Sequence, residues 1–202
     1  MIKHGIAVIF VILATLLVGC AEQSSLPASA ERDADGRYFR GNGQAKVVLE
    51  QWSDFQCPAC AAVKPALDML LNTYGADIKL VYRHFPLSMH PQAIPAARAA
   101  EAAGLQGAFW PMADALLAHQ GEMAQGAVLY ERLAQEINID LERYRQDVES
   151  AWVKDRVNAD LDDAMRLRIP GTPSFVLNDK LLQLRTYADL ENAVKEAIAA
   201  SQ

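Results

Sequence analysis

Two cysteines, Cys57 and Cys60, stand three positions apart where the sequence changes from strand-like to helical. Residues 46–53 are apolar and β-prone, and Pro58 opens a segment of helical periodicity. Cys57 is therefore expected at the helix N-cap, where unpaired backbone N–H groups and the helix dipole favour a thiolate. Cys60 would lie one turn further along the helix, close enough to form a disulfide with Cys57. The two thiols, separated by Pro58 and Ala59, are typical of a redox site.

The same cysteine spacing also occurs in zinc sites and in structural disulfides. Zinc normally needs four ligands, but the sequence has no second cysteine pair of this kind, and His84, His90 and His119 are scattered. A copper site made of the two thiolates alone stays a second interpretation. An inert disulfide at this spacing would add little stability, because so short a loop removes little chain entropy. We expect a redox pair, with no bound metal and no organic cofactor.

Around this pair, the order of elements predicts an α/β fold. The strand at 46–53, a helix from Pro58 to Gly75 and a strand at 78–84 form a βαβ unit, because parallel strands need a crossover. Further predicted elements are helices at 93–103, 108–119 and 127–137, a helix capped by Asp140, a last apolar face at 153–164, strands at 172–177 and 181–185, and a helix at 188–199 that begins after Thr186 with Asp189 in its first turn. The plan is a βαβ half and a ββα half, separated by an all-helical insert at about 91–168.

The first nineteen residues have the features of an export signal. Lys3 is followed by an apolar run at 6–17, which is shorter than the roughly 20 residues of a membrane span. Leu-Val-Gly before Cys20 resembles the bacterial lipoprotein box, in which a lipid is attached to the cysteine and cleavage occurs before it. An ordinary signal peptide that is cut further on is the alternative. We predict a signal peptide at 1–19, a lipidated flexible tether at 20–44, and one folded domain at 45–202.

Composition excludes several classes of protein. The formal charge is −6 and no run of Lys or Arg occurs, so a nucleic-acid partner is not expected. The chain has three cysteines; with Cys20 assigned to lipid, Cys57 and Cys60 remain as a pair. The protein is therefore not a small scaffold held together by disulfides, and its stability must come from a hydrophobic core.

Four segments together resemble one protein family. Residues 52–60 (WSDFQCPAC) resemble the active-site segment of DsbA-type thiol oxidoreductases of the thioredoxin superfamily. Residues 84–91 and 106–110 are similar to recurring segments of that family's helical insert, and residues 171–175 (GTPSF) resemble its cis-proline loop. The resemblance runs from about residue 45 to the C-terminus. It implies a thioredoxin-like fold interrupted by a helical domain.

The resemblance also implies roles for individual residues. Cys57 would be the exposed nucleophile and Cys60 the buried resolving thiol. Thr172 and Pro173 would form a loop facing the disulfide, and a cis bond between them would leave the Thr172 backbone free to bind an extended substrate peptide. Pro170 is a competing candidate for the cis bond. Reoxidation by a membrane partner coupled to quinone is implied as well.

One position departs from the family pattern. The family often has a buried acidic residue six positions before the first cysteine, where this chain has Gln51, which cannot take up a proton. Glu50 is adjacent, but strand alternation directs it to the other face of the sheet. We therefore expect proton transfer at Cys60 to rely on water. Pro58 and Ala59 add no charge beside Cys57, which predicts an oxidising potential that is not extreme.

These observations favour an enzyme that introduces or exchanges disulfide bonds in exported proteins through Cys57 and Cys60. Its expected partners are exported proteins with thiols or disulfides, a membrane redox partner, and a bilayer reached through the lipid on Cys20. The expected location is the cell envelope, facing the periplasm, with the inner or outer membrane left open. The alternative function is a non-catalytic binding module, used for metal delivery or membrane-protein assembly.

Overall fold

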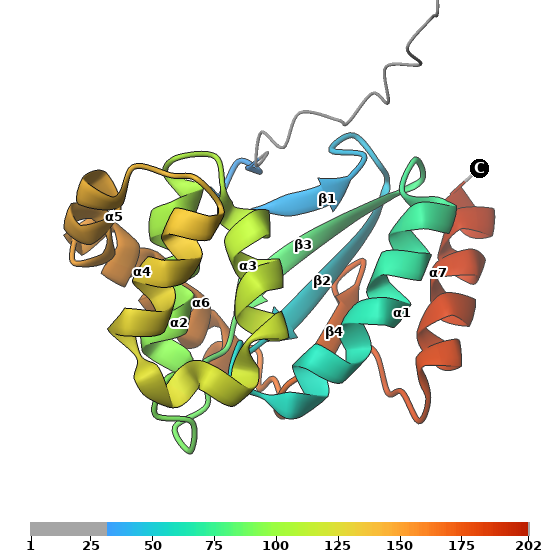
Figure 1. Ribbon diagram of the computed structural model, residues 1–202. Helices are drawn as coiled ribbons and strands as arrows, with labels where there is room; N and C mark the ends of the chain where they lie inside the picture. Colours follow the sequence, from blue (N-terminus) through green and yellow to red (C-terminus); the bar gives the residue numbers. More distant parts are fainter. Residues whose placement is uncertain (1–31, 202) are drawn as a thin grey trace, which may run out of the picture.

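A computed structural model describes residues 32–201 of the protein. Its centre is a five-stranded sheet of order β1-β3-β2-β4-β5 (Figure 1). Strand β2 pairs in parallel with β3, and the other neighbours are antiparallel. The strands are β1 (Phe39–Gly41), β2 (Val47–Ser53), β3 (Ile78–His84), β4 (Ser174–Leu177) and β5 (Lys180–Leu181). The predicted fold class, with a βαβ half followed by a helical insert and a ββα half, is confirmed.

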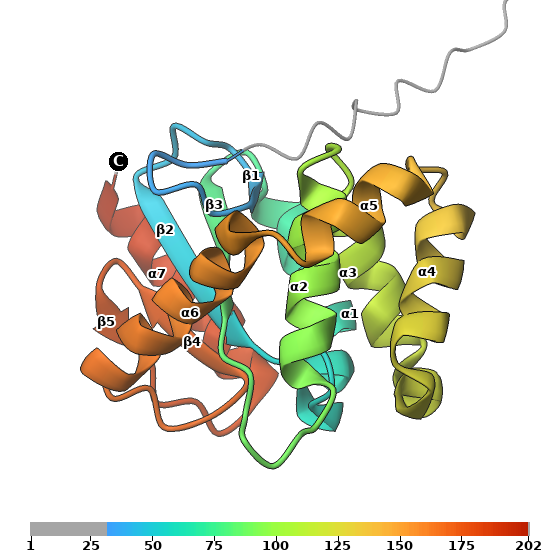
Figure 2. The same cartoon turned by 90° about the vertical axis from the view of Figure 1, so that its left-hand side faces the viewer.

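Helices cover both faces of the sheet. On one face, Leu49 of β2 packs with side chains of α1 (Pro58–Tyr74) and α7 (Tyr187–Ser201). On the other face, Trp52 packs against Ala164 of α6 (Ala151–Arg166), which crosses the sheet in Figure 2. This division follows from the alternation of side chains along β2. The same alternation places Gln51 on the α1 face and Glu50 on the α6 face.

The insert between β3 and β4 is a group of helices beside the sheet (Figures 1 and 2). The alanine-rich α2 is largely buried in its middle, where small side chains let the neighbouring helices approach. Asp140 caps α5 as predicted, accepting a hydrogen bond from the backbone N–H of Arg143, and Ser150 starts a separate helix by capping α6. Besides α6, the insert contains α2 (Ala93–Gly104), α3 (Phe109–Ala118), the 3-10 helix η1 (Gln120–Gln125), α4 (Ala127–Glu136) and α5 (Leu141–Val148).

The folded part begins earlier than the sequence predicted. Residues 32–44, assigned to a flexible tether, include β1, which pairs with the outer edge of β3. Tyr38 is 1% exposed, and its ring stacks on Phe109 of α3 with centroids 4.1 Å apart. A Cβ at Gly104 would collide with the Tyr38 hydroxyl, so a glycine is required there. The apolar pair Tyr38-Phe39 is short and flanked by polar residues, so the sequence pattern did not indicate a strand here. Both residues are buried, which makes this segment part of the domain.

The predicted hairpin is also shorter than expected. Asn178 and Asp179 form its turn with positive φ angles of 45° and 65°, and β5 contains only two residues. Leu182 still donates its backbone N–H to the carbonyl oxygen of Phe175 in β4 at 2.9 Å, but residues 183–185, predicted as strand, leave the sheet. The Asp189 carboxylate accepts hydrogen bonds from the backbone N–H groups of Arg185 and Thr186, which holds this segment to the start of α7 instead.

The predicted signal peptide and Cys20 lie outside the described residues. Within residues 32–201, no helix combines the length and the apolar character needed to cross a bilayer.

Candidate active site

The first cysteine stands at the junction of the sheet and α1, as predicted. Cys57 is the N-cap residue, with φ −75° and ψ 119°, and its side chain makes no capping hydrogen bond. Its carbonyl oxygen accepts hydrogen bonds from the backbone N–H groups of Cys60 and Ala61 at 3.0 and 3.3 Å. The first turn carries no acidic side chain. The sulfur therefore lies at the positive end of the α1 dipole, in a first turn without acidic side chains.

The second cysteine is sealed inside the protein. Cys60 is 0% exposed, and both cysteines are free thiols in this structure. Burial, with a smaller contribution from the neighbouring Cys57, raises the pKa of Cys60 to about 12, although the Asp54 backbone and the Ser53 and Thr172 side chains act to lower it. At neutral pH Cys60 is protonated, so any step that uses its thiolate must first remove a proton.

The loop before β4 closes the site from the opposite side. The Thr172–Pro173 peptide bond is cis, as the resemblance implied, and no other cis bond occurs within residues 32–201. The thiol of Cys57 donates a hydrogen bond to the carbonyl oxygen of Thr172, with an Sγ–O distance of 3.5 Å. Ser174 tightens the loop, since its hydroxyl donates to the carbonyl oxygen of Gly171 at 2.7 Å. The loop thus faces Cys57 directly.

Cys57 is less accessible than the resemblance implied. The residue is 6% exposed, whereas an exposed nucleophile was expected. In the reduced protein its thiol is hydrogen bonded to the Thr172 carbonyl oxygen, which lies against the sulfur. A reacting partner must therefore approach along the cis-proline loop.

A buried carboxylate that the sequence did not single out supports the segment before Cys57. Asp54 has 2% of its surface exposed. One carboxylate oxygen accepts a hydrogen bond from the backbone N–H of Gln56 at 2.7 Å. The other accepts from the backbone N–H of Leu87 at 3.0 Å and from Nδ1 of His90 at 2.7 Å. Asp54 therefore joins the cysteine loop to the segment after β3.

Gln120 in η1 supports the same loop from the helical insert. Its side-chain amide donates hydrogen bonds to the carbonyl oxygens of Phe55 and Cys57 at 2.7 and 2.9 Å. The sequence separation is more than sixty residues, and no motif marks a glutamine for this role. Only the packing of the insert against the sheet could have revealed it.

The structure places Gln51 beneath the site and Glu50 away from it. The Gln51 side chain is buried, and its amide nitrogen donates to the Ser53 hydroxyl at 3.4 Å. Glu50 forms an ion pair of 2.6 Å with Arg83, which also binds Asp160 of α6 at 2.9 Å. The prediction that Glu50 points to the other face is correct. Consequently no carboxylate replaces the family's buried acid from position 50 or 51.

The family profile described as thioredoxin matches residues 33–196 of the chain. This protein belongs to the thioredoxin family. A thioredoxin-like oxidoreductase from Silicibacter pomeroyi DSS-3 has 29% identity and a TM-score of 0.71, covering 82% of this chain and 93% of that one. DsbA2 from Pseudomonas aeruginosa has 27% identity and a TM-score of 0.65, covering 81% and 93%. These matches and the Cys57–Cys60 geometry support a thiol–disulfide oxidoreductase with the DsbA-type fold.

A curated relative shows similarity of a different kind. A protein of Salinispora arenicola named Na(+)/H(+) antiporter NhaA 1 is 41% identical over 149 residues, which are 73% of this chain but 22% of the antiporter. The thioredoxin-family chain thus corresponds to a minor part of the curated relatives it matches.

The thioredoxin-family protein has a hollow of about 530 Å³ beside its cis-proline loop. Pro173, Ser174 and Phe175 line one wall, and the segment after β5, including Leu184 and Arg185, lines the other. Pro173 of the cis-proline loop lines this hollow, whereas Thr172 and the two cysteines do not. No cluster of three or more His, Cys, Asp and Glu side chains suited to a metal ion occurs in the described part of the chain.

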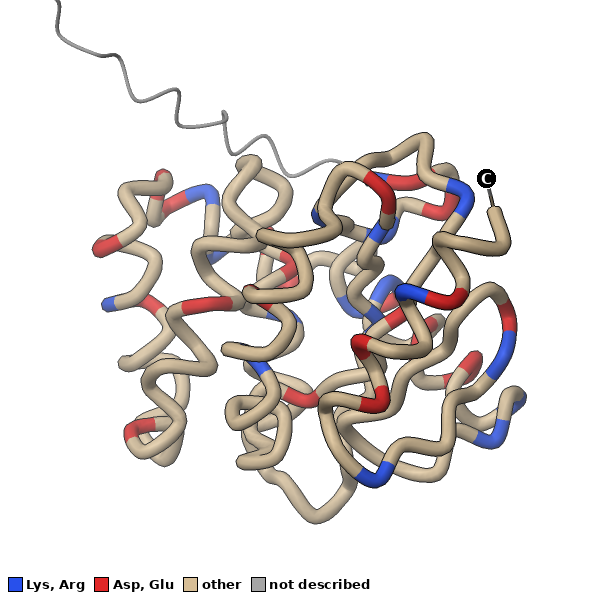
Figure 3. The backbone as a smooth tube through the Cα atoms, turned by 90° about the vertical axis from the view of Figure 1, so that its right-hand side faces the viewer, with Lys and Arg blue, Asp and Glu red and all other residues tan. Residues whose placement is uncertain are grey.

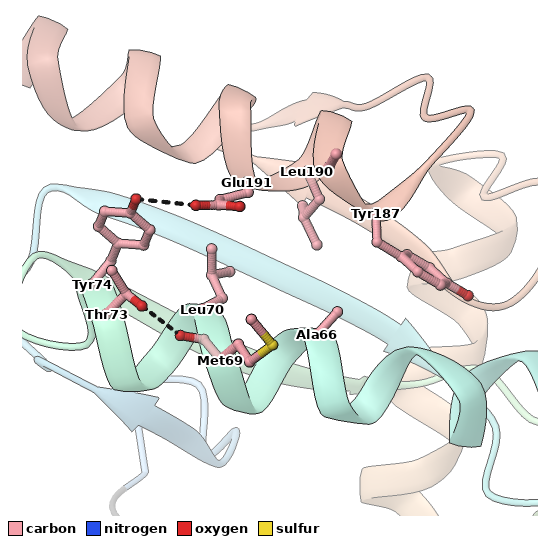
Figure 4. A pocket seen from close by; sticks show the side chains of 9 residues that line it. Ala66, Met69, Leu70, Thr73, Tyr74, Tyr187, Leu190 and Glu191 are labelled. Carbon is pink, nitrogen blue, oxygen red and sulfur yellow. Dashed lines mark hydrogen bonds between the residues drawn. The ribbon is translucent and has the colours of Figure 1, made fainter.

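A second hollow, of about 230 Å³, lies between α1 and α7. Figure 4 shows Met69 and Leu70 on one side and Tyr187 on the other, with the Tyr74 hydroxyl bound to Glu191 at 3.2 Å. Neither cysteine lines it. This second hollow is separate from the redox site of this thioredoxin-family protein.

Proposed function

We propose that this protein introduces or exchanges disulfide bonds in exported proteins, acting in the oxidising direction. The observation that carries the proposal is the arrangement of Cys57, at the start of α1 and facing the Thr172 carbonyl, above the fully buried Cys60. The placement of the Cys57 sulfur at the positive end of the α1 dipole supports the oxidising direction, because a disulfide whose reduced form is favoured is an oxidant.

The proposed reaction has two steps. A substrate thiolate attacks the Cys57 sulfur of the disulfide, a mixed disulfide forms, and Cys60 leaves and takes up a proton. A second substrate thiolate then attacks the substrate sulfur, the substrate disulfide forms, and Cys57 leaves as a thiolate. The two electrons pass from the substrate thiols to the cysteine pair. Thr172 positions the substrate by accepting a backbone hydrogen bond, and Pro173 keeps that carbonyl facing the sulfur.

Two measurements test this function. Reduced, unfolded ribonuclease should regain activity with the oxidised protein, and Cys57→Ser should abolish this effect. Equilibration with glutathione should give a potential between the strongly reducing and the strongly oxidising members of the superfamily. Full activity of Cys57→Ser would disprove the proposal, and a strongly reducing potential would disprove its direction.

We also propose that the protein works at a membrane of the cell envelope, anchored through lipid on Cys20 and reoxidised by a membrane partner. Support comes from the lipoprotein-like sequence before Cys20 and from the similarity to part of a protein named as a membrane antiporter. Acidic and basic positions are mixed along the described backbone (Figure 3), which agrees with a protein partner and not a nucleic acid. Release of the Cys20→Ser variant from the membrane fraction, with retained redox activity, would test the anchor.

A further inference from the structure

A small cavity of about 20 Å³ lies between the sheet and helices α1 and α3, and neither cysteine lines it. Buried Gln51 and Tyr82 line it, together with apolar residues of α1 and α3. Its volume is enough for about one water molecule, which needs on the order of 10–15 Å³. A buried water also needs polar partners, and the Gln51 amide and the Tyr82 hydroxyl supply them.

The Tyr82 hydroxyl is the informative group in this cavity. It is buried and makes no hydrogen bond with any residue in the described part of the chain. A buried hydroxyl without a partner is costly, so its presence next to a water-sized space points to an unseen hydrogen-bond partner. Burial raises the pKa of Tyr82 well above its ordinary value, while the neighbouring Ser53 lowers it and the nearby Cys60 raises it. Tyr82 therefore lies in the same group of polar side chains as the resolving thiol.

Ser53 connects this cavity to Cys60. Its hydroxyl accepts the hydrogen bond from the Gln51 amide, which leaves the Ser53 hydrogen free for another acceptor. Ser53 is also close enough to the Cys60 thiol to lower its pKa. The titratable groups around Cys60 are Cys57 at the N-cap of α1, Tyr82 on β3 and Asp54 in the loop before Cys57.

At its outer end the cavity meets a cluster of ion pairs. Lys64 of α1 binds Asp68 at 2.6 Å, Arg40 of β1 binds Asp114 of α3 at 2.6 Å, and Lys64 approaches Asp114 at 3.5 Å. All four side chains line the cavity or its mouth and are partly exposed. These charged side chains are in contact with solvent, so the cavity lies between the protein surface and the buried polar group.

We propose that this cavity binds one water molecule, held by Gln51 and Tyr82, and that protons pass between solvent and Cys60 through this water, Tyr82 and Ser53. The inference rests on the proposed function, because it concerns the proton that Cys60 gains or loses during disulfide exchange. When Cys60 attacks the Cys57 sulfur of a mixed disulfide, the Cys57–substrate bond breaks and the substrate leaves as a thiolate. The Cys60 proton passes outward through Ser53 and Tyr82 to the water. In the oxidising direction the same route returns a proton to Cys60.

The test isolates the step in which Cys60 acts. The mixed disulfide between Cys57 and glutathione is prepared at acid pH and transferred to neutral pH, and closure of the Cys57–Cys60 disulfide is followed by rapid mixing. Tyr82→Phe and Ser53→Ala should each slow closure by about tenfold to a hundredfold, the low end of what a positioned proton-transfer group contributes. The equilibrium constant with glutathione should stay unchanged, because the route alters the rate and not the end states.

Tyr130→Phe is the matched control, since Tyr130 is also buried but its hydroxyl binds Gln92 in the helical insert. This variant should close at the wild-type rate. Gln51→Glu, combined with Tyr82→Phe, should restore fast closure by placing a proton acceptor in the cavity, and the pH dependence of closure should differ from that of the wild type. A crystal structure should show a water within hydrogen-bonding distance of Gln51 and Tyr82.

Wild-type closure rates in both Tyr82→Phe and Ser53→Ala would overturn the inference, as would a cavity without ordered water. If Ser53→Ala fails to fold, Tyr82→Phe decides alone. Failure of the wild-type protein to exchange with glutathione would instead reject the proposed function, so the two failures are distinguishable.

Discussion

The thiol of Cys57 and the carbonyl oxygen of Thr172 lie 3.5 Å apart and share a hydrogen bond in the reduced protein. An extended substrate would use this same carbonyl to accept a backbone N–H. When Cys57 ionises it loses the hydrogen it donates, so the carbonyl becomes available as the sulfur becomes reactive. If the substrate binds in this way, substrate binding and thiolate formation would be coupled at this one oxygen.

The positions of the two cysteines predict different products when each is replaced. Cys60→Ser keeps the reactive sulfur and removes the resolving one, so it should accumulate a mixed disulfide with oxidised glutathione. Cys57→Ser should accumulate none, because Cys60 is fully buried. Intact-mass measurement after a fixed incubation checks both. An adduct on Cys60 forming as fast as the one on Cys57 would contradict the assigned roles.

The buried thiol predicts a loss of stability in alkali. Burial raises the pKa of Cys60 from 9.0 to about 12, so above pH 9 the unfolded chain loses this proton while the folded chain keeps it. The free energy of unfolding of the reduced protein should therefore fall between these two values, by up to about 1.4 kcal/mol per pH unit from this group. Below the lower value the group has no effect.

Urea unfolding of the reduced protein across this range, compared with Cys60→Ser, measures the effect. Tyrosines contribute equally to both proteins, so the difference between the two curves belongs to Cys60. Parallel curves for the two proteins would show that the thiol ionises as easily folded as unfolded.

The pair of Asp54 and His90 predicts strong coupling between their replacements. Asp54→Ala removes the acceptor for His90 and for two backbone N–H groups, and should lower the free energy of unfolding by about 3–5 kcal/mol. His90→Ala should cost less, and the double variant should show a coupling of about 1–3 kcal/mol. Glu136→Ala, which breaks an exposed pair with Arg132, should cost less than about 1 kcal/mol. Additive effects for Asp54 and His90 would mean that their contact contributes nothing.

The early start of the folded part predicts a large effect at Tyr38. Tyr38→Ala removes a buried ring stacked on Phe109 and should lower the free energy of unfolding by about 3–5 kcal/mol. Tyr187→Ala serves as the comparison, because Tyr187 is 43% exposed and should change stability by less than about 0.5 kcal/mol. If Tyr38→Ala and Tyr187→Ala lowered the free energy of unfolding by equally small amounts, residues 32–44 would be a tether and not part of the folded domain.

Local patterns in the sequence determined most of the fold and the reacting atoms. The cysteine spacing at a strand-to-helix junction, the order of helices and strands, and the cap at Asp140 all depend on residues close together in the chain. The cis bond at Pro173 was inferred from a short motif, and the structure confirms it. Alternation along β2 also separated Gln51 from Glu50 correctly.

Only the tertiary structure decided which distant residues support those atoms. Tyr38, directly before β1, stacks on Phe109 of α3 and so fixes this segment to the domain. His90 and Gln120 support the site loop through contacts between segments far apart in the sequence. Such contacts leave no periodic signal. The contact of Cys57 with the Thr172 carbonyl likewise involves a backbone atom that no residue type could reveal. The sequence indicated which two thiols react. Packing determined how each thiol is buried, which groups it is hydrogen bonded to, and which side chains surround it.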